Sequence, residues 1–295
     1  MKPADLAELL ALAAIWGASF LFMRWGAPEF GALSLAWLRV LFASLALLPL
    51  LWWRQGGGSW ALMRTHWRPL LLMSFANSAL PFVLFAYAAL HLPAGLSSIL
   101  NATVPMWGAL VAWAWLGQAP TAWRLLGLAV GFGGVVLLVW AKTGLGGDAR
   151  FWAVLACLLA TLNYAVAAMA TKRWLGDLPP LAVATGSQVG AALWLLVPGL
   201  WAWPSVMPGV EAWGSLLALA LLCTGVAYIL YFRLMARVGP TNAITVTFLI
   251  PVFAVVWGAL FLGEALTLPM LGGGVLVLGG TALALGLWPR AQPAA

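Results

Sequence analysis

Charged side chains are scarce in this chain. Asp, Glu, Lys and Arg make up only 7% of its 295 residues, whereas a soluble domain has about 25%. So few charges cannot cover a surface that faces water, and the chain is instead 64% hydrophobic. The composition therefore excludes an ordinary soluble domain and predicts a protein that is surrounded by lipid.

The residues that most enzymes use for chemistry are also few. The sequence has two histidines, His66 and His91, and two cysteines, Cys157 and Cys223. They show no spacing typical of a metal site or of a disulfide framework. No pair of carboxylates falls at helical spacing within an apolar run, and no Ser or Cys has a general base nearby in the sequence. We therefore expect a protein that is not an enzyme and that needs no cofactor and no metal.

Long apolar runs take up most of the chain. A helix that crosses the bilayer needs about 20 predominantly apolar residues, and connections rich in Gly and Pro separate runs of that length. We predict an all-α integral membrane protein with ten transmembrane helices, near residues 6–25, 31–53, 69–91, 95–116, 122–140, 151–172, 180–200, 211–236, 241–262 and 268–288.

The sequence repeats itself at about half its length. The same residue type recurs 146 positions later for Pro105, Leu116, Gly117, Gly127, Gly133 and Gly134, which pair with Pro251, Leu262, Gly263, Gly273, Gly279 and Gly280. We therefore expect two related halves of five helices each, residues 1–145 and 146–295. Because an odd number of helices begins and ends on opposite sides of the membrane, the second half is predicted to be inverted relative to the first.

Glycines are concentrated in the fifth and the tenth predicted helices, which carry almost no polar groups in their interior. Small residues allow the backbones of two helices to approach closely. We expect these glycines to serve helix packing, within one half or between two copies of the chain, and not to contact the substrate.

The basic residues predict how the chain is oriented in the membrane. Ten of the 14 Lys and Arg fall on the side of the N-terminus, three fall on the other side (Arg24, Lys142 and Arg150), and Arg39 lies inside the second helix. Basic loops tend to stay in the cytoplasm, so we expect both termini there. The net charge of +7 is dispersed over separate loops, which argues against a nucleic-acid partner.

Polar side chains inside the predicted helices are few, and hydrocarbon penalises them unless water or another polar group is near. Several lie at related depths of the two predicted halves. Asn77 pairs with Thr224 at an offset of 147 residues, and Pro105 pairs with Pro251 at an offset of 146. Interrupted helices at corresponding positions point to a central binding site. We predict that the substrate contacts Trp16, Asn77, Ser78, Asn101, Trp107, Asn163, Tyr164, Thr224, Tyr228 and Thr247. The alternative is that these residues only hold helices together, at about 0.6 kcal/mol for each hydrogen bond.

Arg39 is the only Lys or Arg well inside a predicted helix. It has either a structural role or a functional one, as an anchor for a substrate carboxylate or as the partner of Glu29 at an outer gate. Glu264 is expected to cap the turn that follows the ninth helix. The seven acidic residues all lie in connections or near helix ends, so we expect export by facilitated diffusion without proton coupling.

The order of several motifs resembles a known family. Trp16-Gly17-Ala18-Ser19-Phe20, Arg39, Pro93-Ala94-Gly95, Pro105 and Leu262-Gly263-Glu264 are similar to the EamA family of the drug/metabolite transporter superfamily, over nearly the whole chain. Within that family the chain looks most like the YddG-type exporters of aromatic amino acids. The resemblance implies a ten-helix inverted-repeat fold and outward movement of small metabolites. Halves in the family often contain Leu-Gly-Glu, but the first half here has Leu116-Gly117-Gln118, so a symmetric pair of carboxylates is not expected.

These observations predict an exporter of small metabolites, above all aromatic and other amino acids, in the inner membrane of a bacterium. We expect it to work by alternating access, as a monomer or a homodimer, with a small-molecule substrate and the lipid bilayer as its partners. Two alternatives remain open. A multidrug exporter of lipophilic compounds would be favoured by an acidic residue in the cavity, whereas paired helix interruptions argue against a channel.

The predicted topology can be tested by labelling single cysteines in a chain from which Cys157 and Cys223 have been removed. Cysteines at Ser59, at Leu178 and at the C-terminus should be shielded from an impermeant thiol reagent added outside the cell, because the charge distribution places them in the cytoplasm. Cysteines at Leu145 and Val206 should react. Equal labelling of both sets would contradict the inverted repeat.

Overall fold

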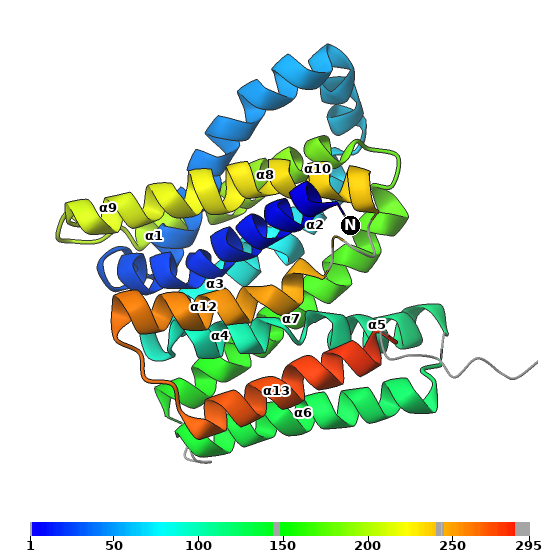
Figure 1. Ribbon diagram of the computed structural model, residues 1–295. Helices are drawn as coiled ribbons and strands as arrows, with labels where there is room; N and C mark the ends of the chain where they lie inside the picture. The colour runs from blue at the N-terminus through cyan, green and yellow to red at the C-terminus, as the bar shows by residue number, and fades with distance from the viewer. Residues whose placement is uncertain (1, 118, 144–147, 240–242, 244, 287–295) are drawn as a thin grey trace, which may run out of the picture.

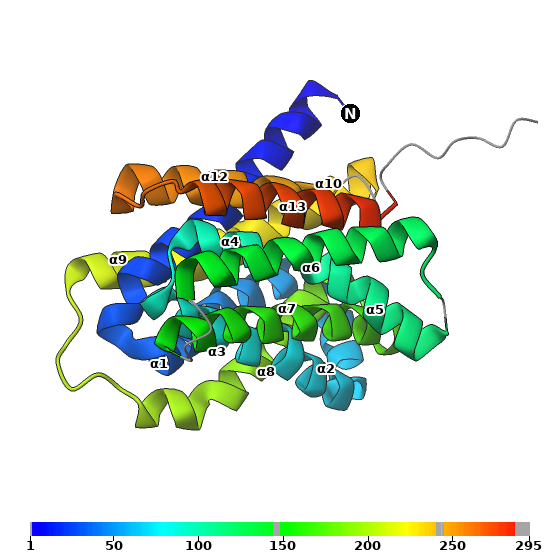
Figure 2. The same ribbon diagram turned by 90° about the horizontal axis from the view of Figure 1, so that it is seen from below.

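The computed structural model describes residues 2–117, 119–143, 148–239, 243 and 245–286, and within these ranges the chain forms helices and short connections but no strand. The helices are stacked with many of their axes roughly along one direction, as Figure 1 and Figure 2 show. The prediction of an all-α protein is confirmed.

Seven helical segments of the described chain are long and apolar enough to cross a bilayer. They are α1 (Pro3–Thr65); α2 (Trp67–Ser74), which continues through the π-helix η1 (Phe75–Ala79) into α3 (Leu80–His91); α4 (Ala94–Asn101) with α5 (Val104–Leu116); α6 (Ala122–Thr143); α7 (Ala149–Trp174); α8 (Pro180–Trp201); and α9 (Val210–Leu217), which continues through the π-helix η2 (Ala218–Val226) into α10 (Ala227–Val238). Two shorter apolar helices follow, α12 (Val246–Leu262) and α13 (Leu268–Ala284). The chain is a multi-pass membrane protein.

The helical run α1 is broken at two glycines. Its 63 residues include the first two predicted helices, which meet at Gly31, where the backbone leaves the helical conformation. Gly31 has a φ of +71°, a conformation that glycine adopts without steric cost, and the chain turns back on itself there (Figure 1). A second such residue, Gly56, has a φ of +61° and is followed by further helix as far as Thr65. The connection expected after residue 53 is therefore present as a break at Gly56, but it is shorter than expected because the chain is helical again beyond it.

The structure contains irregular backbone at the depths where the sequence predicted paired interruptions. The π-helix η1 contains Asn77, and the π-helix η2 contains Thr224, its partner in the repeat. α4 and α5 are separated by a turn at residues 102–103, just before Pro105. Single π turns frequently occur at functional sites. In a membrane protein, irregular backbone is tolerated where it is covered by protein or lines a cavity, which is where these segments lie.

The glycine-rich helices α6 and α13 pack directly against each other (Figures 1 and 2). Their backbones are so close that a Cβ on Gly127 would lie 2.6 Å from the backbone nitrogen of Ala284. A Cβ on Gly280 would lie 2.6 Å from the carbonyl oxygen of Gly127. The expected role in packing is confirmed for Gly127 and Gly280 but not for Gly133 and Gly279, where a Cβ would have no atom within 4 Å. The partner is different from the one expected, because the contact joins α6, within residues 1–145, to α13, within residues 146–295.

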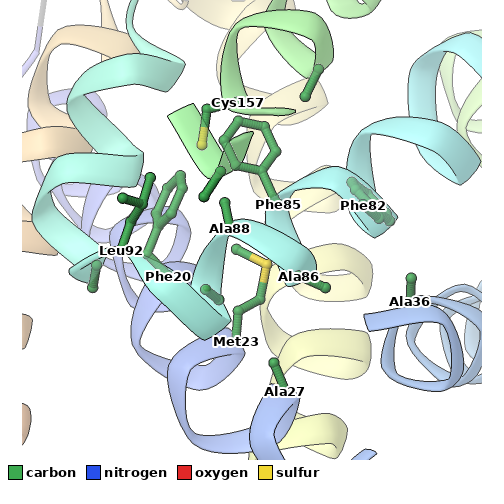
Figure 3. Packing of buried hydrophobic residues seen from close by; sticks show 14 of the residues in the cluster. Phe20, Met23, Ala27, Ala36, Phe82, Phe85, Ala86, Ala88, Leu92 and Cys157 are labelled. Carbon is green, nitrogen blue, oxygen red and sulfur yellow. The ribbon is translucent and has the colours of Figure 1, made fainter. Parts of the chain in front are cut away.

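The largest buried cluster of apolar side chains lies where α1, α3 and α7 meet. Figure 3 shows Phe20 and Met23 of α1 beside Phe85 of α3, with Cys157 of α7 close by. The rings of Phe20 and Phe85 are edge to face, with centroids 5.7 Å apart. Phe20, Met23 and Phe85 also line the cavity of the next subsection, so this cluster forms its floor.

Replacing Gly280 by Leu should destabilise the fold, and replacing its neighbour Gly279 by Leu should not. A side chain at Gly280 would overlap the backbone of α6, whereas a Cβ on Gly279 would have no atom within 4 Å. Overpacking of a close contact costs about 1–3 kcal/mol. The measurement is thermal unfolding of both purified variants in the same detergent, with a lower Tm expected only for Gly280→Leu. Equal melting temperatures would show that the α6–α13 contact is not limiting.

Candidate functional site

A cavity of about 760 Å³ extends from one end of the bundle into its centre. Its mouth lies between the ends of α5, α6, α7 and α13, where Leu116, Arg124 and Lys172 are exposed. The same end of the molecule carries the start of α1 (Figure 1). The cavity is therefore open toward the N-terminal end of α1 and reaches buried side chains halfway along the helices.

Arg39 is the charged residue at the inner end of this cavity. It lies on α1 beyond the Gly31 turn, and only 7% of its surface is exposed. Its guanidinium carbon stacks over the ring of Phe82 at 3.9 Å from the centroid. Its Nε donates to Thr224 Oγ1 at 3.2 Å, and its Nη1 lies 3.9 Å from Met23 Sδ. All of these partners are uncharged, and no ion pair joins Arg39 to a carboxylate in the described part of the chain.

The suggested pairing of Arg39 with Glu29 is wrong. The Glu29 carboxylate accepts a hydrogen bond of 2.5 Å from the backbone N–H of Gly209, in the connection before α9. This contact holds Glu29 just before the break in α1 at Gly31, away from Arg39. The Arg39 charge is consequently left facing the cavity without an acidic neighbour.

Aromatic rings surround the guanidinium and continue along the cavity wall. The ring of Tyr164 on α7 stacks on Phe85 with centroids 6.2 Å apart, and Trp16 on α1 packs on Tyr231 of α10 at 5.3 Å. Tyr228 lines the same wall. Such rings offer an apolar surface together with a negative face that attracts cations.

The charges in the lining are all of one sign. Among the described residues the cavity is lined by Arg39, Arg124 and Lys172, and by no Asp, Glu or His. Low-dielectric walls lined by one sign of charge concentrate ligands of the opposite sign. The cavity is thus suited to a ligand that carries an anionic group and an apolar body.

The structure brings seven of the predicted site residues to this one cavity: Trp16, Asn77, Asn101, Tyr164, Thr224, Tyr228 and Thr247. Asn77 donates from its amide to Ser187 Oγ of α8 at 3.2 Å. Asn101, at the end of α4, makes no hydrogen bond through its side chain to any described residue. An amide that is presented in this way can donate to a ligand and accept from it.

Three of the predicted residues lie outside the cavity. Ser78 is fully buried and bonds Ser187 at 3.0 Å and Gln188 at 3.1 Å, so it holds η1 to α8. Trp107 packs its ring on Phe132 of α6 at 4.9 Å.

Asn163 is the third, and its amide donates to the carbonyl of Leu159 one turn earlier at 2.8 Å. For Ser78, Trp107 and Asn163 the geometry thus favours the alternative of helix–helix or intrahelical contacts.

Most of the apolar lining was not identified from the sequence. Phe82, Phe85 and Gly108 line the cavity, but in a chain this hydrophobic they look no different from residues that face lipid. The sequence did contain one signal for part of this lining. Ser19 and Phe20 belong to the motif at residues 16–20, and both line the cavity.

The other end of the bundle is closed by a polar contact between three helical segments. Glu264, just after α12, accepts a hydrogen bond of 2.9 Å from the backbone N–H of Ala94, the first residue of α4. Arg24 of α1 lies 3.5 Å from the same carboxylate oxygen and donates to the carbonyl of Ala89 at 2.6 Å. Glu264 therefore caps α4, and the expectation that it caps the turn after its own helix is wrong.

The chain is similar to several transporters over most of its length. It is 25% identical to the uncharacterized transporter YvbV of Bacillus subtilis (strain 168), over 92% of this chain and 88% of that protein. It is 29% identical to the probable terminal-alkyne amino-acid exporter of Streptantibioticus cattleyicolor, over 91% and 89%. The uncharacterized inner membrane transporter YedA of Escherichia coli (strain K12) is 25% identical over 94% and 90%. A solved crystal structure superposes with a TM-score of 0.66 at 17% identity, over 97% of this chain and 98% of that one, and so shares the fold.

A family match covers both halves of the sequence. Residues 6–140 and residues 151–286 each match the EamA-like transporter family, as the resemblance of the motifs predicted. Its members are transporters, which fits the expectation of a protein that is not an enzyme. Since the two matches together cover most of the chain, it belongs to the EamA-like transporter family.

Proposed function

We propose that this protein exports amino acids, above all aromatic ones, across the inner membrane of a bacterium. Residues 1–145 and 146–295 form two inverted repeats of five helices, with both termini in the cytoplasm, and the protein works by alternating access as a monomer or a homodimer. The two family matches over residues 6–140 and 151–286 support the repeat. The names of two relatives, an amino-acid exporter and an inner membrane transporter, support the substrate class and the location.

The observation that carries the proposal is Arg39. A guanidinium stays charged in a protein, and a buried charge without a partner is costly. A carboxylate in the cavity supplies the missing charge and matches the fork of the guanidinium with two parallel hydrogen bonds. Every amino acid carries such a group, whatever its side chain.

The surrounding residues suit the rest of an amino acid. Asn77, Asn101 and Thr224 present polar atoms at the irregular turns of their helices, close to where the ammonium group would lie. Tyr164 and Trp16 offer aromatic faces, which attract an ammonium group and also pack against an apolar side chain.

The charges of the lining count against the multidrug alternative. A site for lipophilic cations needs an acidic or strongly electronegative pocket, whereas the described lining contains three basic residues and no acidic one. The closed far end argues against a channel. Arg24, Glu264 and the start of α4 hold that end together, so a substrate passes only if this contact opens and the mouth closes.

Replacing Arg39 by Gln should remove the preference for a carboxylate. The pair of substrates is phenylalanine and phenylalanine amide, which differ only in the group that Arg39 would bind. Hydrogen bonds to charged groups contribute about 1.5–3 kcal/mol, so the acid-to-amide ratio of kcat/KM in liposomes should fall by about tenfold or more. Phenylalanine is a zwitterion and its amide is a cation, so Arg124→Gln, which removes the same charge at the mouth, measures the effect of charge alone and should change the ratio much less than Arg39→Gln does.

A structural role for Arg39 gives a different result. If Arg39→Gln lowers the transport of the acid and of the amide by the same factor, the guanidinium does not recognise the carboxylate. Thermal unfolding of the purified variant is measured in parallel, so that a loss of folded protein is not mistaken for a loss of transport.

Transport should not be driven by a pH gradient. Proton-coupled carriers use an Asp, Glu or His that changes its protonation within the transport path, and the described lining contains none of these. We therefore expect liposomes to accumulate substrate only up to its equilibrium level, with or without an imposed pH gradient. Accumulation above that level that disappears when an ionophore is added would show that proton coupling exists.

A further inference from the structure

The wall of the cavity opposite the aromatic rings is built from small residues. On α5 the lining includes Gly108, Ala109 and Ala112 beside the larger Val104, Pro105 and Leu116, and on α7 Ala165 and Ala168 line the same space between Tyr164 and Met169. Gly108 is unlike the glycines of the α6–α13 contact, because a Cβ built on it would have no atom within 4 Å. Its lack of a side chain leaves open volume in the cavity and does not serve a close approach of two helices.

Two contacts show how deep Gly108 lies relative to α7. Thr103 Oγ1, at the start of α5, donates to Thr161 Oγ1 of α7 at 3.1 Å. At the other end of α5, the rings of Trp115 and Trp174 meet with centroids 6.2 Å apart. α5 and α7 therefore run in the same direction with a nearly constant offset in residue number. Gly108 lies five residues after Thr103, so it has the same depth as residue 166, which lies five residues after Thr161.

This depth places Gly108 next to the ligand that Arg39 would hold. Phe82, under the Arg39 guanidinium, lies one turn before Phe85, and Phe85 stacks on Tyr164. Gly108 is two residues nearer to the mouth than Tyr164, which is about 3 Å along the helix axis. By this reckoning Gly108 and Arg39 lie at similar depths of the cavity that both residues line, so a ligand anchored at Arg39 shares the cavity with the open volume over Gly108.

We propose that Gly108 determines how large a side chain the substrate can have. With the carboxylate at Arg39, the side chain of the amino acid lies between the aromatic rings and the small residues of α5 and α7. The open volume over Gly108 admits the ring of an aromatic amino acid. This inference rests on the proposed function, since it assumes an amino acid that is anchored by Arg39.

The experiment compares Gly108→Leu with Gly133→Leu in liposomes, using tryptophan, phenylalanine and alanine as substrates. Gly133, on α6, is exposed, lies outside the cavity lining, and a Cβ on it would also have no atom within 4 Å. Both variants therefore add the same side chain to a helix without a clash. Thermal unfolding of both purified variants checks that each is folded.

The expected result is a loss of large substrates alone. A misfit of one or more methylene groups in an apolar pocket changes kcat/KM by about 10–200-fold. Gly108→Leu should therefore lower kcat/KM for tryptophan and phenylalanine by at least tenfold and for alanine by less than about twofold. Gly108→Ala should fall between wild type and Gly108→Leu, and Gly133→Leu should behave like wild type.

Several results would overturn the proposal. An unchanged order of substrates in Gly108→Leu, or an equal loss for all three substrates, would show that Gly108 does not set the size limit although amino acids are transported. A wild-type protein that moves none of the three amino acids would instead contradict the proposed function, and the role of Gly108 as a limit on amino-acid size with it.

Discussion

Hydrocarbon offers no hydrogen-bond partner to a backbone N–H or C=O, and the whole architecture follows from this constraint. The described chain satisfies it with helices throughout most of its length. The departures from regular helix are concentrated beside the cavity: η1 carries Asn77, η2 carries Thr224, and the turn between α4 and α5 follows Asn101. Irregular backbone and polar side chains thus meet beside the cavity, where water can solvate both.

Because the surroundings have a low dielectric constant, the few charged side chains determine which contacts hold helices together and which site is available to a ligand. Arg39 is held by an aromatic face, a hydroxyl and a thioether, which position the guanidinium without neutralising it. At the far end of the bundle, Arg24 and Glu264 are paired with each other and with the start of α4. A paired charge holds helices together, and an unpaired charge beside a cavity is available to a ligand. The cavity and the far end of the bundle therefore use their charged side chains differently.

The sequence predicts the class of protein well and the orientation of single helices poorly. The scarcity of charge and the long apolar runs are enough to predict an all-α membrane protein, and the resemblance of its motifs points to the family. However, Tyr164 lines the cavity whereas its neighbour Asn163 does not, and Gly108 lines it whereas Trp107 does not. Neighbouring residues on a helix point about 100° apart, and a helix that is apolar on all sides carries no pattern that says which direction is inward. The sequence predicted a reversal between the first two helices, but it did not show that one glycine with a positive φ, Gly31, would make it in place of a connecting loop.

The contact between α6 and α13 also bears on how the protein is made. α6 ends at Thr143, whereas the surface that it packs against, around Gly280, belongs to α13. During synthesis the glycine face of α6 enters the bilayer well before α13 is made, so its partner arrives only after the helices between them. Helices that are inserted one after another associate only when their partners are present. α13 therefore joins the early and the late parts of the described chain, and a nascent chain that stops before α13 leaves the glycine face of α6 without its partner.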